Sequence, residues 1–258
     1  GFFKPKYPIL VSDFAGIVEE VGQGVTKFKV GDRVFGEMSG GGAFAEYTCA
    51  PENVCGLMTD EYDYTEMACL PIAGLTALQA LITHGKLKKG ESVLINGSSG
   101  GVGHLAVQIA KAYGANVIAV CSSKNIDFVK SIGANKAIAY DKENIHLHKE
   151  KYDLIVDTNG NLNYADYKRM GKRGVMVGFT NMVHMISVLL KKCFGKFPLS
   201  QFTAEANNKD LNELSKLIID GKLKPHIEKT YSYTETPEAI GYIESMRTRG
   251  KVAMSWDL

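Results

Sequence analysis

The sequence predicts an α/β protein in which a doubly wound parallel sheet is joined to a smaller, β-rich part. An apolar run at 92–95 is followed by glycines three residues apart, Gly97, Gly100 and Gly103, and then by a helical pattern. Short strands and helices alternate after that point, which is typical of a parallel sheet. The front of the chain instead favours strands joined by glycine turns.

The β-rich part comes first in the chain. Strands are expected at 14–21, 29–35 and 42–48, where apolar residues alternate with polar ones or follow a Gly-Asp turn. Helical periodicity begins near Thr65, and a helix is expected from Leu75 to His84.

The alternating part follows, and its elements are short. Strands are expected at 92–95, 116–120, 136–140, 153–157, 174–178 and 199–204, and helices at 103–113, 125–132 and 163–170. An amphipathic helix at 210–220 ends at Gly221, and the tail adds a strand at 227–233, a helix at 237–246 and a strand at 251–256.

The glycine turn after 92–95 has the context of a phosphate-binding loop. Glycines allow the backbone to approach a phosphate closely, and the start of the next helix presents unpaired N–H groups with a partial positive charge. A second strand at 116–120 completes a βαβ unit. This arrangement indicates a Rossmann dinucleotide site, although an ordinary tight turn has the same glycines.

The end of the second strand indicates which dinucleotide would bind. An acidic residue there would bind the ribose of NAD, but this strand is followed by Ser122, Ser123 and Lys124, with no carboxylate before Asp127. Hydroxyls and an ammonium suit the 2′-phosphate of NADPH. The alternative is an ordinary helix start with a solvated lysine.

Composition excludes several classes of function. Lys plus Arg (30) nearly equals Asp plus Glu (28), and the net charge is +2. That balance argues against a nucleic-acid or membrane-surface binder that works by bulk charge. The 5 cysteines are odd in number and scattered, which indicates reduced thiols and a cytoplasmic location.

The motifs together resemble the zinc-independent medium-chain dehydrogenase/reductases, the quinone oxidoreductase (zeta-crystallin-like) family. The match rests on residues 12–22, 30–34, 42–47, 70–77 and 96–103, with the ending at 221–225 and 249–252. The resemblance implies a GroES-like substrate domain at 1–72 plus 223–258 and an NADP-binding Rossmann domain at 73–222. Relatives carry the first strands of the GroES-like domain ahead of this point, so that part is expected to be missing here.

The resemblance also implies roles for individual residues. The diphosphate is expected at Ser99, Gly100, Gly101 and Val102, and the 2′-phosphate at Ser122 and Lys124. Tyr140 matches an aromatic residue near the adenosine phosphate, and the nicotinamide side is expected at Asn161, Gly178, Phe179 and Thr76. Tyr140 and these four also fit ordinary strand-end, turn or helix-start roles. No catalytic residue is assigned.

The chain departs from the zinc-dependent relatives of that family. They place Gly-His-Glu where this chain has Val11, Ser12 and Asp13, and a cysteine where it has 70–73. The close set of four cysteines that binds structural zinc is absent from the sequence. No metal is therefore expected, and Val11 stands where glycine is usual.

The resulting hypothesis is an NADPH-dependent reductase of quinones or α,β-unsaturated carbonyls that works by hydride transfer without a metal. Two alternatives remain: a non-catalytic NADPH-binding or partner-binding protein, and a metal-free NADP-linked alcohol dehydrogenase or carbonyl reductase. The expected partner is a small carbonyl or quinone substrate, with no nucleic acid and no membrane. A homodimer is implied only by the resemblance.

Overall fold

A computed structural model describes residues 9–256 of the chain. The chain forms two compact units, divided after Leu75 and after Thr203. Of the described residues, the first unit contains 9–75 and 204–256, and the second contains 76–203. Among the described residues, no helix is both long and apolar enough to cross a bilayer.

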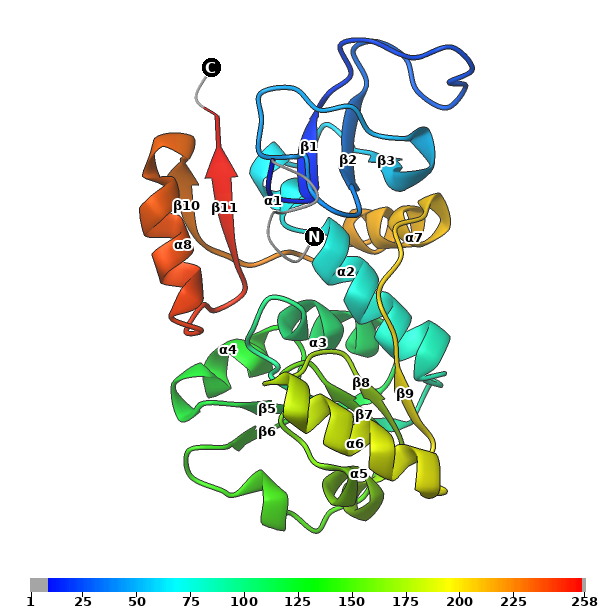
Figure 1. Cartoon of the computed structure of the whole chain (residues 1–258), viewed down its shortest axis with the longest axis vertical. Helices are drawn as coiled ribbons and strands as arrows, with labels where there is room; N and C mark the ends of the chain where they lie inside the picture. The colour runs from blue at the N-terminus through cyan, green and yellow to red at the C-terminus, as the bar shows by residue number, and fades with distance from the viewer. Residues whose placement is uncertain (1–8, 257–258) are drawn as a thin grey trace. The chain divides into compact units, whose positions relative to one another are not determined.

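The second unit is built on a parallel sheet of six strands in the order β6-β5-β4-β7-β8-β9 (Figure 1). The strands are β4 (Ser92–Asn96), β5 (Asn116–Cys121), β6 (Lys136–Ala139), β7 (Tyr152–Asp157), β8 (Gly171–Met176) and β9 (Leu199–Gln201). The order runs outward in both directions from β4 and β7, which is the topology of a doubly wound sheet. The predicted fold class is confirmed, and each predicted strand of the sheet is present.

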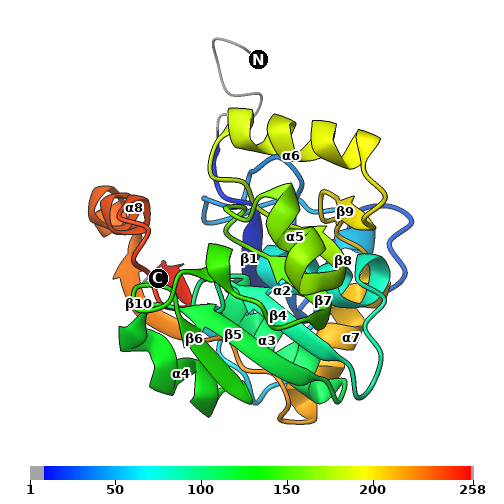
Figure 2. The same ribbon diagram turned by 90° about the horizontal axis from the view of Figure 1, so that it is seen from below.

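Helices cover both faces of this sheet. Figure 2 shows α3 (Gly103–Ala112) and α4 (Ile126–Ser131) on one face, and α5 (Tyr164–Met170) and α6 (Met182–Phe194) on the other. Leu94, Ile155 and Tyr167 are fully buried between the sheet and the second helix layer. The sequence analysis did not predict α6, although its apolar residues recur at helical spacing.

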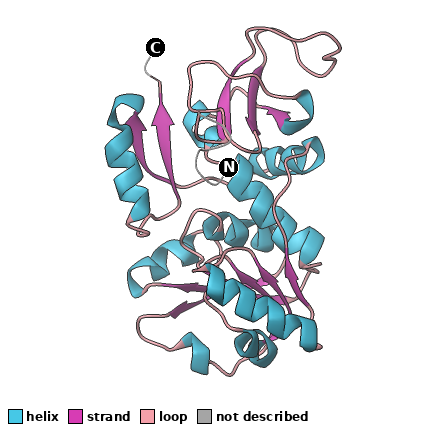
Figure 3. Ribbon diagram, viewed as in Figure 1, coloured by secondary structure: helices cyan, strands magenta, loops and turns pink. Residues whose placement is uncertain are grey.

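The first unit contains two small sheets (Figure 3). One is antiparallel, with β1 (Asp13–Ile17), β2 (Arg33–Glu37) and β3 (Cys55–Leu57), and the other is the parallel pair β10 (Ile227–Ser232) and β11 (Lys251–Ser255). The helices α1 (Tyr64–Ala68), α7 (Asn208–Ile219) and α8 (Thr236–Glu244) belong to it, whereas α2 (Pro71–Leu78) spans the division and continues as a π-helical turn at Gln79–His84.

The predicted strand at 42–48 is wrong. Gly40, Gly41 and Gly42 have positive φ at the start of this segment, and the N–H of Ala45 donates to the carbonyl of Ala43 at 2.9 Å, which is a tight turn rather than a strand. The N–H groups of Ala43 and Phe44 instead donate to the carbonyls of Val11 and Leu10.

The helix α7 lies in the first compact unit, although the boundaries expected from the sequence place it with the nucleotide domain. Its Asn208 side chain donates to the carbonyls of Glu52 (3.0 Å) and Cys55 (2.6 Å) and accepts from the Lys27 ammonium (2.7 Å). These bonds hold the start of α7 against the end of the antiparallel sheet.

Val11 has a φ of 60°, in the left-handed region. A β-branched residue there costs on the order of 1–3 kcal/mol. The family resemblance implies glycine at this position, and the backbone explains why glycine would suit it.

Candidate functional site

The glycine turn between β4 and α3 requires its glycines for steric reasons. Gly97 has a φ of 83°, and a Cβ there would lie 2.5 Å from Oγ1 of Thr158. A Cβ on Gly103 would collide with the carbonyl of Gly97. The turn is therefore packed closely between the start of α3 and the loop after β7.

Several backbone N–H groups of the glycine turn have no backbone acceptor among the described residues. Gly97 and Ser98 donate to the carbonyl of Val120 (3.1 and 3.0 Å), and Gly100 donates to that of Gly97 (3.1 Å). Within residues 9–256, the N–H groups of Ser99, Gly101 and Val102 have no such backbone partner. They lie at the N-terminus of a ten-residue helix, where an anion is stabilised. The structure thus brings together the four residues predicted to hold a diphosphate.

The end of β5 contains an unsatisfied hydroxyl. The Oγ atom of Ser122 is buried and has no hydrogen-bond partner among the described residues. A buried hydroxyl without a partner is costly, so a ligand oxygen is the natural group to satisfy it. Lys124 is exposed two residues further on, in the 3-10 turn Ser123–Asn125.

A carboxylate that the sequence analysis missed lies next to these residues. The backbone N–H and the Oγ of Ser123 both donate to Asp141, at 2.7 and 2.6 Å. These two bonds lower the pKa of Asp141 below its ordinary value. Asp141 follows β6, and only the pairing of β5 with β6 brings it to Ser123. Ser122, and not Ser123, is therefore the hydroxyl left for a ligand.

Two further contacts join this region to the glycine turn and to β6. The Asn125 side chain donates to Oγ of Ser99 at 3.0 Å. The N–H of Tyr140 donates to the carbonyl of Cys121 at 3.0 Å, and its side chain is 55% exposed. The residues predicted for the diphosphate, the 2′-phosphate and the adenosine side accordingly lie at the carboxyl ends of three neighbouring strands.

The point where the strand order reverses is occupied by a pair of buried polar residues, Asn96 on β4 and Asp157 on β7. The two residues are paired in register, and the amide nitrogen of Asn96 donates to Asp157 at 2.7 Å. The same nitrogen donates to Oδ1 of Asn161 at 2.6 Å. In open α/β sheets ligands bind beyond the strand ends at this reversal, so the pair fixes Asn161 where a ligand would lie.

Asp157 also organises the loop that follows it. Its carboxylate accepts hydrogen bonds from the N–H groups of Gly160 (2.9 Å) and Leu162 (3.0 Å) and from the hydroxyl of Tyr167 (3.1 Å). Burial raises the pKa of Asp157, and these donors oppose the rise. The sequence analysis did not find Asn96 or Asp157. Their signal is a polar residue at the last position of a strand, directly after three buried apolar residues.

The loop after β8 packs on the loop after β7. A Cβ on Gly178 would lie 2.5 Å from the carbonyl of Thr158, and Thr180 donates to the carbonyl of Gly160 at 2.8 Å. Phe179 is 48% exposed beside them. Asn161, Gly178 and Phe179 are therefore brought to one place, whereas Thr76 comes from α2 and its predicted role stays a prediction.

The place where zinc-dependent relatives carry metal ligands holds a different arrangement. Asp13 on β1 lies opposite Glu37 on β2, and Nζ of Lys251 is 3.8 Å from the Asp13 carboxylate. Burial raises the pKa of Asp13 to about 6. Within residues 9–256, no three His, Cys, Asp or Glu side chains are grouped so that they could hold a metal ion. The residues present do not fit zinc, and an ammonium lies beside the acidic pair.

Comparison with known proteins identifies the class. Residues 1–60 match the alcohol dehydrogenase GroES-like domain, and residues 132–254 match the zinc-binding dehydrogenases. The chain is 34% identical to the chloroplast envelope quinone oxidoreductase homolog of Arabidopsis thaliana, over 97% of this chain and 81% of that one. It is 32% identical to the chloroplastic NADPH-dependent alkenal/one oxidoreductase of the same plant, over 94% of this chain and 62% of that longer protein.

A solved structure gives the same result. Quinone oxidoreductase from Escherichia coli, in complex with NADPH, superposes with a TM-score of 0.83 at 25% identity, covering 98% of this chain and 85% of that one. The fold and the glycine turn define a nicotinamide-dependent oxidoreductase. The chain belongs to the medium-chain dehydrogenase/reductase family, as the sequence motifs predict.

Asp157→Asn tests the network at the strand reversal. Both carboxylate oxygens of Asp157 accept hydrogen bonds, and the substitution replaces one of them with an NH2 group that cannot accept. The donors bound to that oxygen lose their acceptor, so we expect the free energy of unfolding to fall by about 2–4 kcal/mol. Urea denaturation measures the loss. Asp127→Asn, at an exposed position on α4, is the matched control and should change stability by less than about 0.5 kcal/mol. Equal stability of the two variants would show that Asp157 does not hold this loop.

Asp13→Asn tests the raised pKa beside Lys251. Because folded Asp13 titrates near 6 and a free aspartate near 4, the folded chain binds more protons between these values, and stability falls as pH rises through that window. Asparagine cannot ionise, so the variant should be more stable at neutral pH by on the order of 2 kcal/mol and should lack the fall. Urea titrations across that pH range check this, with exposed Asp60→Asn as control. A variant less stable than the parent at neutral pH would contradict the raised pKa of Asp13.

Proposed function

We propose that this protein is an NADPH-dependent reductase of quinones or α,β-unsaturated carbonyls that works by hydride transfer without a metal. The observation that carries the proposal is the edge formed by β4, β5 and β6. There a glycine turn with unpaired N–H groups lies near the buried, unsatisfied hydroxyl of Ser122 and the exposed ammonium of Lys124. These donors are complementary to a dinucleotide that carries one additional phosphate.

Each part of this edge has a proposed task. The N–H groups of Ser99, Gly101 and Val102 would bind the diphosphate, and Gly100 would leave room for it. Ser122 and Lys124 would hold the 2′-phosphate, while Asp141 keeps the Ser123 hydroxyl engaged and Tyr140 covers the adenosine side. The bound nucleotide supplies the hydride.

The second half of the proposed site lies beyond the strand reversal. Asn161, held by Asn96, would orient the nicotinamide together with Gly178, Phe179 and Thr76. The nucleotide domain, expected at 73–222, would correspond to the second unit, 76–203, and α7 would belong with the substrate domain, expected at 1–72 and 223–258. The protein would contribute position and exclusion of water rather than a nucleophile.

The proposed substrate class follows from how readily an acceptor takes up hydride when no metal is present. A quinone or an enone accepts hydride at an electron-poor carbon without a metal to stabilise an alkoxide, and its proton can come from water or a hydroxyl. The ammonium of Lys251 beside Asp13 disfavours a cation there, which agrees with a metal-free reaction. Relatives with quinone oxidoreductase and alkenal/one oxidoreductase activity in their names support this class.

The activity is tested by following NADPH absorbance with a small quinone and with an alkenal as acceptors. We expect acceptor-dependent NADPH oxidation that chelators do not inhibit. Tight NADPH binding without turnover of either acceptor would favour a non-catalytic binding protein. Reversible oxidation of a simple alcohol with NADP, in the absence of enone or quinone reduction, would favour an alcohol dehydrogenase.

Lys124→Ala tests the selectivity for NADPH. Loss of a charge-assisted contact to the 2′-phosphate should weaken NADPH binding by about tenfold or more, with NADH binding unchanged. Calorimetric titration with both nucleotides measures the two affinities. Lys130→Ala, an exposed lysine on α4 in the same unit, is the control and should change neither. If the substitution weakened the binding of both nucleotides equally, or of neither, Lys124 would not be a ligand of the 2′-phosphate.

A further inference from the structure

The outer face of α6 is apolar and has no partner in the described chain. It carries Met182, Val183, Ile186, Leu190 and Phe194. Val183 is 78% exposed and Phe194 is 91% exposed. Four of these residues are spaced four apart, so they form one continuous row along the helix.

The opposite face of α6 already has its partner. Val188 is buried in the core of the second unit, and Met185 and Leu189 pack against that core. A surface helix usually has one apolar face and one polar face, whereas a helix that is apolar all round is normally buried. The outer row therefore indicates a second apolar environment. Contiguous exposed apolar side chains of this kind mark protein–protein or membrane contacts.

The charge around this row is of one sign. Between Asp166 and Glu205 the chain has seven basic residues and no acidic one: Lys168, Arg169, Lys172, Arg173, Lys191, Lys192 and Lys196. Arg169 is paired with Asp166 on its own helix, and Lys172 and Arg173 are paired with Asp153 and Glu91 of the same unit. The other four lysines have no ion pair within residues 9–256.

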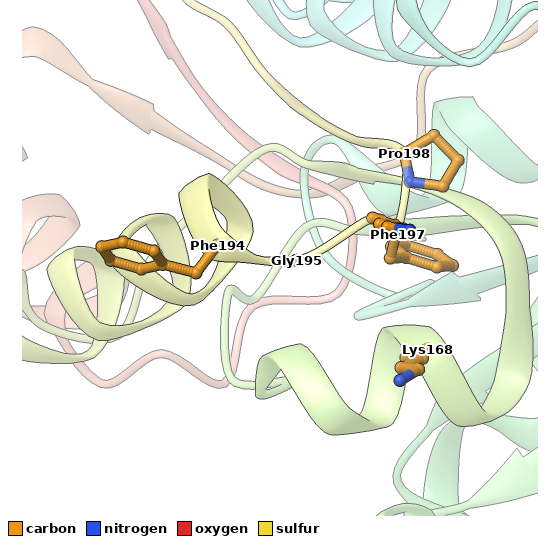
Figure 4. Close-up of a pocket in the computed structure, with 6 residues that line it drawn as sticks. Lys168, Phe194, Gly195, Phe197 and Pro198 are labelled. Carbon is orange, nitrogen blue, oxygen red and sulfur yellow. The ribbon is translucent and has the colours of Figure 1, made fainter.

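Two of these unpaired lysines lie at the end of the apolar row. Lys168 of α5 and Lys196 line an open hollow of about 440 Å³ together with Phe194, Phe197 and Pro198. Figure 4 shows Phe194 extending away from Gly195 at the end of α6, while Phe197 lies on the other side of that glycine above Lys168. Apolar and cationic side chains therefore lie together at this end of the helix. We call the outer apolar row, together with Lys168, Lys191, Lys192 and Lys196, the α6 surface.

We propose that the α6 surface docks on an anionic lipid bilayer, with α6 lying in the plane of the membrane interface. Apolar residues on the outer row would enter the boundary between headgroups and acyl chains. The unpaired lysines would contact lipid phosphates, with their stems along the apolar surface. The helix is 13 residues long, so it would lie on the bilayer rather than span it.

The unpaired lysines of the α6 surface favour an anionic bilayer over a second copy of the chain as its partner. A symmetric dimer through this surface would place the same patch on both sides and bring two sets of unpaired lysines together. An anionic bilayer neutralises those lysines instead. The formal net charge of +2 hides this pattern, because acidic residues elsewhere in the chain balance the basic segment. The proposal is independent of the reaction that the protein catalyses.

Sedimentation with sucrose-loaded vesicles tests the proposal on the full chain. We expect binding to vesicles of phosphatidylcholine mixed with phosphatidylglycerol, weak binding to phosphatidylcholine alone, and a loss of binding at raised salt. Lys191→Glu with Lys192→Glu should lower the partition coefficient by about tenfold or more. Leu190→Ser with Phe194→Ser should lower it similarly, because the apolar contribution is removed.

Matched controls separate this surface from general charge and hydrophobicity. Lys88→Glu with Lys89→Glu changes the same charge at another exposed place in the second unit, and Met246→Ser removes an apolar side chain that is 94% exposed. Both controls should bind vesicles as the parent does. Circular dichroism and urea midpoints confirm that the variants are folded.

Three results would overturn the proposal. These are no binding to anionic vesicles, equal binding to neutral and anionic vesicles, and equal loss of binding in the controls. A parent dimer that the Phe194 variant converts to a monomer, with vesicle binding unchanged, would assign the surface to a second copy instead. Light scattering after gel filtration measures that outcome.

Discussion

The hydrogen bond from Asn96 to Asp157 is the interaction on which the candidate site depends. It joins the two strands at which the sheet order reverses, and it holds them in register at their carboxyl ends. The same amide positions Asn161, and the same carboxylate organises the backbone of the loop after β7. A buried carboxylate is costly unless donors surround it, and here the loop supplies them. The fold and the site are consequently stabilised by one network.

The other side of the site shows how neighbouring strands decide ligand chemistry. Ser122 and Ser123 look equivalent along the chain, yet Asp141 engages Ser123 and leaves Ser122 without a partner. A carboxylate this close to a phosphate-binding position lowers the local positive potential. The preference for NADPH that we propose therefore rests on Lys124 and the Ser122 hydroxyl, working against an acidic neighbour.

The α6 surface shows that average charge is a poor guide to local chemistry. Near-neutral composition argues against membrane binding through bulk charge, and that argument holds for the molecule as a whole. Between Asp166 and Glu205 the chain nevertheless has only basic charges, and three of them are neutralised by carboxylates of the same unit. What remains unpaired is concentrated beside exposed apolar side chains.

Sequence alone determined the parallel sheet, the order of its strands along the chain and the phosphate-type glycine turn, because these depend on local periodicity and on glycine sterics. It did not predict α6, although apolar residues recur along that helix at helical spacing. It also placed a strand at 42–48, where the chain follows a run of glycines with positive φ and then makes a tight turn at 43–45. Tertiary structure decided which side chains meet: Asp141 with Ser123, Asn96 with Asp157, and Lys251 with Asp13. Each of these pairs joins residues that are far apart in the sequence. Strand pairing brings the first two pairs together, and packing between two different sheets brings Lys251 to Asp13.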